Sequence, residues 1–123
     1  MNDDKTRIGI VAPGRALDHS IADRVTALAG STAELIFHPQ CFLRDGHFAG
    51  PDAARADAFV QFANDPSLDA VWFARGGYGA CRLLDTAFER LGEAARRKTY
   101  LGYSDTGFLL ARLAREGIGR VAH

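Results

Sequence analysis

The 123-residue sequence has few cysteines, no long apolar run and no excess of either charge. Cys41 and Cys81 are too few for a disulfide scaffold, and their separation matches no zinc-ligand spacing, so we expect two buried thiols and no metal. Fifteen basic residues balance fifteen acidic ones, which argues against nucleic acid as the main partner. The apolar run from Ile8 to Ala12 is too short for a signal peptide or a membrane span. We therefore expect a cytoplasmic protein with no membrane partner.

Apolar residues are nevertheless plentiful, at 47% of the chain. That share and this length are typical of one compact domain, and they exclude a disordered chain, a collagen and a coiled coil. Apolar runs rich in β-branched and aromatic residues predict five strands, and these runs are nearly continuous rather than alternating, as in a parallel sheet covered on both faces. The predicted strands are Arg7–Ala12, Ala33–His38, Asp69–Ala74, Thr99–Tyr103 and Ile118–Ala122.

Helical spacing of apolar residues fills the intervals between these strands. The alternation of strands and helices predicts an α/β fold: a doubly wound parallel sheet of about five strands in three layers, with right-handed crossovers. We expect Asp18 and Asp52 to cap the first two helices. The connection from His38 to Pro51 has no period of its own and is expected to be a surface loop. The predicted helices contain Ile21–Ala29, Ala56–Ala63, Leu84–Leu91 and the residues from Leu109 onward.

Ligands of such sheets gather at the carboxyl ends of the strands, where three segments fall: Ala12–Arg15, Arg75–Gly79 and Gly102–Thr106. Ser104 is the most informative residue, because it follows a short strand and opens a helix, as the serine of a nucleophile elbow does. The second glycine of G-x-S-x-G comes one residue late, at Gly107. A plain helix cap is the alternative role for Ser104, although Gly107 supplies no capping-box partner.

The glycines of Arg75-Gly76-Gly77-Tyr78-Gly79 leave backbone N–H groups open, so this loop is able to hold an anion or supply an oxyanion donor. The alternative is a loop that needs glycine only for its dihedral angles. Neither a Walker loop nor a dinucleotide fingerprint is present, which argues against a nucleotide cofactor. Arg75 is suited to bind a carboxylate or to pair with a neighbouring acid. His19, His38 and His47 lack i, i+4 partners and are not expected to bind metal.

In combination, Ile8–Pro13, Asp69–Gly79, Leu101–Asp105 and Val121–His123 resemble the N-terminal domain of serine LD-carboxypeptidases, a family that includes the microcin-immunity peptidases. The resemblance covers essentially the whole chain. It implies a flavodoxin-like domain and an enzyme that releases a terminal D-amino acid from an L,D-peptide, typically a murein tetrapeptide during cell-wall recycling. It also implies a Ser-Glu-His triad that uses no metal or cofactor.

By this resemblance Ser104 is the nucleophile, and the backbone N–H groups of Asp105 and Gly77 are the oxyanion donors. Arg75, Gly76 and Tyr78 are the implied substrate-binding residues.

In the family the Glu and His come from a second, C-terminal domain, and no residue near Ser104 replaces them. Glu116 would lie about three helical turns away, and His123 resembles the junction into the second domain. We therefore interpret residues 1–123 as the N-terminal nucleophile-bearing domain, with the C-terminal domain absent and the isolated chain inactive. The expected partners are a murein-type peptide and the C-terminal domain of the same protein.

Two alternatives remain open from the sequence. One is a stand-alone module that binds a small anion or a peptide carboxylate. The other is a domain that forms a homodimer through apolar surface that the absent half would otherwise cover.

Overall fold

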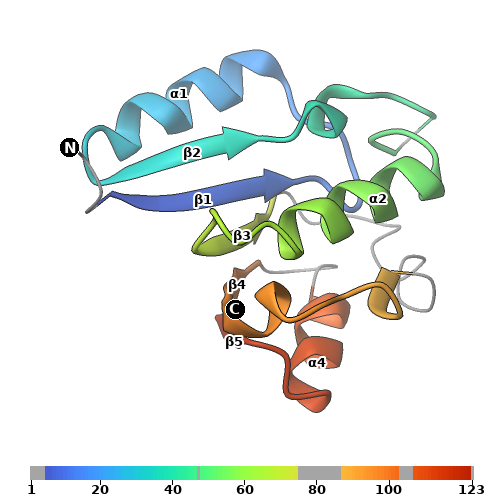
Figure 1. The fold of residues 1–123 in the computed structure, drawn as a ribbon. Helices are drawn as coiled ribbons and strands as arrows, with labels where there is room; N and C mark the ends of the chain where they lie inside the picture. Colours follow the sequence, from blue (N-terminus) through green and yellow to red (C-terminus); the bar gives the residue numbers. More distant parts are fainter. Residues whose placement is uncertain (1–4, 47, 75–86, 103–106, 123) are drawn as a thin grey trace.

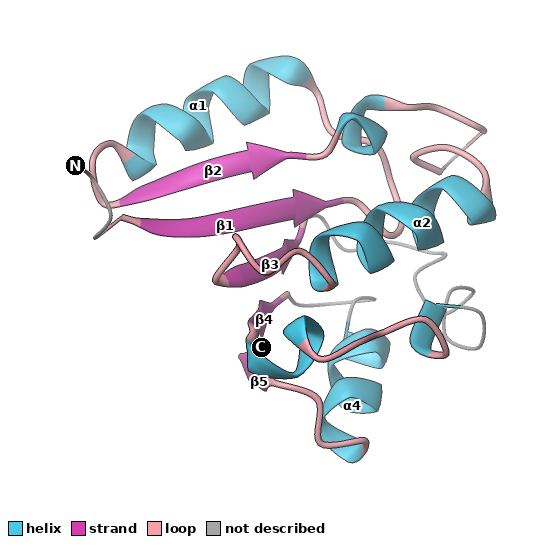
Figure 2. Cartoon of the chain, in the orientation of Figure 1, coloured by secondary structure: helices cyan, strands magenta, loops and turns pink. Residues whose placement is uncertain are grey.

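A five-stranded parallel sheet forms the centre of the molecule (Figures 1 and 2). The computed structural model describes residues 5–46, 48–74, 87–102 and 107–122. The strand order is β2-β1-β3-β4-β5, with every neighbouring pair parallel, which is the flavodoxin-like order. The predicted α/β fold and the predicted number of strands are therefore confirmed. The strands are β1 (Thr6–Val11), β2 (Ala33–Phe37), β3 (Ala70–Phe73), β4 (Thr99–Leu101) and β5 (Arg120–Ala122).

Helices cover both faces of this sheet, so the molecule has the three predicted layers (Figure 1). The helical elements are α1 (His19–Ala29), α2 (Asp52–Ala63), α4 (Gly107–Arg115) and two 3₁₀ helices, η1 (Pro39–Phe42) and η3 (Ala94–Arg97). Successive strand residues point to opposite faces. Trp72 accordingly faces α1, whereas Val71 and Phe73 pack with residues of α2 and α4. None of the helices in the described ranges has the length and apolar character needed to cross a bilayer.

The core under α2 and α4 contains a cluster of aromatic side chains among aliphatic ones. The Phe59 ring packs edge-on against Phe73, with ring centroids 5.4 Å apart, and lies 5.7 Å from the Phe88 ring. Tyr100 is fully buried, and its hydroxyl donates a 2.6 Å hydrogen bond to the Ala95 carbonyl. Burial raises the pKa of this phenol, so it remains a neutral donor and fixes η3 beside β4.

Of the two predicted helix caps, one is present and one is not. Asp18 caps α1 as predicted, and its carboxylate accepts from the Ser20 N–H at 3.3 Å. The predicted cap of α2 is wrong: Pro51 is the N-cap residue, and Asp52 is already inside the helix and pairs with Arg55. The proline at the cap fixes an extended backbone just before the helix, so the helix begins one residue after it.

The connection from His38 to Pro51 is also more ordered than predicted. It begins with η1, in which Gln40 and Cys41 are buried. A proline at the start of η1 favours a helical turn. The buried side chains of Gln40 and Cys41 have hydrogen-bond partners, and the spacing of apolar residues in the sequence does not reveal such partners. The description of this segment as an irregular surface loop is therefore wrong for its first part.

Gly117 and Gly119, between α4 and β5, allow a matched test of close packing. Both have φ of +68°, but a Cβ on Gly117 would meet no atom within 4 Å, whereas one on Gly119 would overlap the Lys98 carbonyl and lie 2.8 Å from the Tyr100 ring. We expect Gly117→Ala to lower the free energy of unfolding by about 1 kcal/mol through backbone strain. Gly119→Ala should lower it by about 3 kcal/mol or more, because overpacking adds to that strain. Urea unfolding checks both variants, and equal losses would contradict the packing of β5 against β4.

Candidate functional site

The carboxyl ends of β3 and β4 lie side by side at one edge of the sheet. Trp72 is paired with Leu101 in the parallel register, so the residues that follow, Ala74 and Gly102, reach the same edge. Ala74 N donates to the Val11 carbonyl at 2.9 Å, and Gly102 N donates to the Ala122 carbonyl at 3.2 Å. The sheet thus brings the starts of the two segments that carry the predicted site residues to neighbouring positions.

The predicted site residues themselves lie outside the described residues. This applies to all six of them: Arg75, Gly76, Gly77, Tyr78, Ser104 and Asp105. The elements that flank Ser104 are described, and they have the order that a nucleophile elbow requires: β4 ends at Leu101 and α4 begins at Gly107. The individual roles of these residues stay predictions.

The sheet also has the strand reversal at which α/β proteins bind ligands. The chain passes from β1 to the outer strand β2 and then returns to β3, on the other side of β1. The crevice of such a sheet opens between the loops that follow the two strands at the reversal, here the loop from Ala12 to Leu17 and the segment after Ala74. The loop after β1 is fully described, and two buried side chains bind its backbone.

A buried glutamine fixes the start of that loop. Gln40 is 2% exposed, and its side-chain oxygen accepts from Ala12 N at 3.1 Å. Its amide group donates to the carbonyls of Ala12 and Ala49, each at 2.7 Å. One side chain therefore joins the end of β1 to the segment that precedes α2.

A buried arginine fixes the next residue. Arg55 of α2 is 0% exposed and donates to the carbonyls of Pro13 at 2.6 Å and Gly50 at 3.2 Å. Its guanidinium also pairs with Asp52 and lies 4.6 Å above the centre of the Phe48 ring. A buried charge is tolerated only with such partners, and here two of them are backbone carbonyls, one of which lies in the loop after β1.

Sequence reasoning missed both side chains. Arg55 lies four residues before Phe59 on the buried side of α2, so its position on the apolar stripe was the available signal. Gln40 gave no such signal.

The described thiol and imidazoles are unsuited to nucleophilic or metal chemistry. Cys41 is fully buried as predicted, and desolvation raises the pKa of its thiol to about 12. The His38 ring is occupied by Gln61 at 2.8 Å and by the Gln40 N–H at 3.0 Å, and His19 stacks on Phe42. No group of three potential metal ligands occurs in the described part of the chain. Cys81 and His47 fall outside it.

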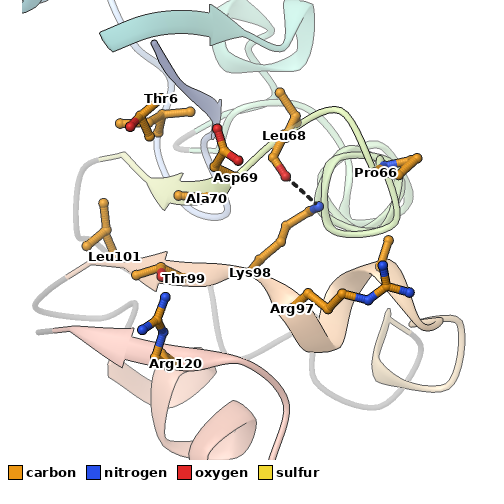
Figure 3. A pocket seen from close by; sticks show the side chains of 12 residues that line it. Thr6, Pro66, Leu68, Asp69, Ala70, Arg97, Lys98, Thr99, Leu101 and Arg120 are labelled. Atoms are coloured by element: carbon orange, nitrogen blue, oxygen red, sulfur yellow. Dashed lines mark hydrogen bonds between the residues drawn. The ribbon is translucent and has the colours of Figure 1, made fainter. Parts of the chain in front are cut away.

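A cavity of about 580 Å³ lies mainly around the other, amino edge of the sheet, among residues such as Asp69, Lys98 and Arg120 (Figure 3). Lys98 is 2% exposed and donates to the Asp65 and Leu68 carbonyls at 2.5 and 2.9 Å. Burial lowers the pKa of its ammonium group. The partners of Lys98 are backbone carbonyls of the turn before β3. Lys98 therefore joins the start of β4 to that turn, and its role is structural.

Comparison with known proteins decides the family. Residues 8–123 match the profile of the LD-carboxypeptidase N-terminal domain. The chain belongs to this family. A Streptomyces coelicolor protein named as a carboxypeptidase is 34% identical over 103 residues, which cover 80% of this chain and 33% of that protein. The murein tetrapeptide carboxypeptidase of Pseudomonas aeruginosa is 28% identical over 115 residues, which cover 91% of this chain and 37% of the relative.

Solved structures agree with this assignment. The muramoyltetrapeptide carboxypeptidase from Oxalobacter formigenes superposes with a TM-score of 0.78 at 28% identity, over 91% of this chain and 38% of that one. The microcin C7 self-immunity protein MccF, in complex with aspartyl sulfamoyl adenosine, gives a TM-score of 0.75 at 25% identity, over 91% of this chain and 35% of that one. The LD-carboxypeptidase-like chain thus spans about a third of the length of these relatives.

The buried thiol gives a direct test of the packing around η1. In a Cys81→Ser variant, Cys41 is the remaining thiol. With a pKa of about 12, a fraction on the order of 10⁻⁴ is thiolate at pH 8, and the thiolate is the reactive form. We expect iodoacetamide, followed by mass spectrometry, to label the native protein at least about a hundredfold more slowly than the urea-unfolded protein. Equal labelling rates would contradict the burial of η1.

Proposed function

We propose that this chain is the nucleophile-bearing domain of a serine carboxypeptidase that releases a terminal D-amino acid from an L,D-peptide such as a murein tetrapeptide. One observation carries the proposal: β4 leads through a short connection into α4, directly beside the end of β3. In a member of the LD-carboxypeptidase family, this arrangement favours Ser104 as a nucleophile over Ser104 as a plain cap. The cytoplasmic recycling of cell-wall peptides is the process that we propose for the whole enzyme.

In the proposed mechanism, the Ser104 hydroxyl attacks the carbonyl carbon of the bond before the terminal D-residue. The backbone N–H groups of Asp105 and Gly77 donate to the oxyanion as negative charge develops, and the partial positive charge at the start of α4 adds to that stabilisation. The C–N bond then breaks, the D-amino acid leaves with the proton taken from Ser104, and water hydrolyses the acyl-enzyme. Arg75, Gly76 and Tyr78 bind the peptide, and the reaction needs no cofactor.

A proton acceptor for Ser104 must come from elsewhere in the protein. Glu116 follows the far end of α4, a helix about 13 Å long, and its carboxylate pairs with Arg112. We therefore propose that a Glu and a His from a C-terminal domain complete the triad, in keeping with the greater length of the relatives. The isolated 123-residue chain would then be inactive, because a serine without its base is a weak nucleophile.

Ser104→Ala in the full-length protein tests this proposal. We expect release of the D-amino acid from an L,D-tetrapeptide to fall by a factor on the order of 10⁶, as for removal of a triad serine. Two controls should keep their turnover: Ser67→Ala, an exposed hydroxyl before β3, and Glu116→Gln. Turnover that survives in Ser104→Ala, or is lost in Glu116→Gln, would refute the assigned roles.

A further inference from the structure

The loop after β1, at the carboxyl edge of the sheet, has one charged and exposed side chain. From Ala12 to Leu17 every residue is buried except Arg15, which is exposed. No hydrogen bond or ion pair joins its guanidinium to the residues that the structure describes. Pro13 is fully buried beside it, so the loop has little freedom to turn Arg15 away from the edge.

The backbone of this loop is tied down along its length. Ala49 N donates to the Gly14 carbonyl at 2.8 Å, and Leu17 N donates to the Cys41 carbonyl at 2.7 Å. Gln40 holds both backbone groups of Ala12, and Arg55 holds the Pro13 carbonyl. A loop fixed in this way loses little conformational entropy when a ligand binds to it.

The strand order sets the distance from this loop to the end of β4, the strand that leads to Ser104. Only β3 separates β1 from β4, and neighbouring strands lie about 4.8 Å apart, so the ends of β1 and β4 are about 10 Å apart. A peptide attacked at Ser104 has its terminal carboxylate about one residue, or ~3.8 Å, beyond the reacting carbonyl. A long arginine side chain on the β1 loop is able to span the remaining gap.

We propose that Arg15 is a specificity-determining residue that binds a carboxylate of the substrate peptide, and that Arg55 and Gln40 are positioning residues that hold its loop. A guanidinium binds a carboxylate through two parallel hydrogen bonds, and a carboxypeptidase substrate ends in this group. The inference rests on the proposed function and extends it from the nucleophile to the recognition of the substrate.

Steady-state kinetics of the full-length enzyme test the role of Arg15. We expect Arg15→Ala to raise KM about tenfold, the loss of one charge-assisted contact, with kcat changed by less than about twofold. Arg15→Lys should recover part of that loss. Arg115→Ala, an exposed arginine in the last turn of α4, is the matched control and should leave KM unchanged. An unchanged KM in Arg15→Ala would overturn the assignment.

Two substrates identify which carboxylate is bound, one with its internal carboxylates free and one with them amidated. An effect of Arg15→Ala on both peptides assigns the terminal carboxylate, and an effect on the first alone assigns an internal one. An enzyme that releases no D-amino acid from either peptide would fail the proposed function. If the enzyme releases the D-amino acid but its KM does not depend on Arg15, only this inference is contradicted.

A double-mutant cycle tests the positioning role. Arg55→Lys keeps the positive charge but loses the planar guanidinium that reaches the carbonyls of Pro13 and Gly50, so KM should rise. The KM of the double variant Arg15→Ala/Arg55→Lys should be no higher than that of Arg15→Ala alone. Multiplied effects on KM would overturn the positioning role. If thermal unfolding shows Arg55→Lys to be unfolded, Phe48→Leu, which removes the ring beneath the guanidinium, replaces it in the cycle with the same expected outcome.

Discussion

The parallel hydrogen-bond ladder from β1 through β3 to β4 is the constraint on which the site depends. Its register sets Val11 beside Phe73 and Trp72 beside Leu101, so three strands end at one edge. A shift of one residue would turn every side chain to the other face and expose the aromatic core under α2 and α4. The core that stabilises the sheet therefore also holds together the residues that lead into the two segments with the predicted site residues.

Buried polar groups extend this order beyond the strands. At the carboxyl edge, Gln40 and Arg55 bind backbone groups of the β1 loop, and at the amino edge Lys98 binds carbonyls before β3. Each of these groups is costly to bury alone, and each is buried where the backbone offers partners outside the ladder. In both places a buried side chain provides hydrogen-bond partners for the backbone of a loop, as the ladder does for the backbone of a strand. The difference is that the loop at the carboxyl edge lies where sheets of this topology bind their ligands.

The sequence predicted the fold well because continuous apolar runs and helical spacing are determined by burial, as at Val71 and Phe59. It predicted the element ends and the polar network less well. Asp52 had the chemistry of a cap, yet Pro51 determines where α2 begins. Gln40 lies in a segment without period, and its burial depends on carbonyls that come from distant parts of the chain. The site was predicted from motif order. The sheet places Ala74 and Gly102, which lead into the two predicted segments, at one edge, while Ser104 and Gly77 themselves lie outside the described residues.

The proposed mechanism requires the Ser104 hydroxyl to lie next to the glycine loop after β3. A crystal structure of the full-length enzyme with a tetrahedral inhibitor bound to Ser104 measures this directly. We predict that the inhibitor oxygen lies about 3 Å from the backbone nitrogens of both Asp105 and Gly77. An oxygen that contacts neither amide, or a Ser104 side chain packed beneath the sheet edge where no inhibitor reaches it, would contradict it.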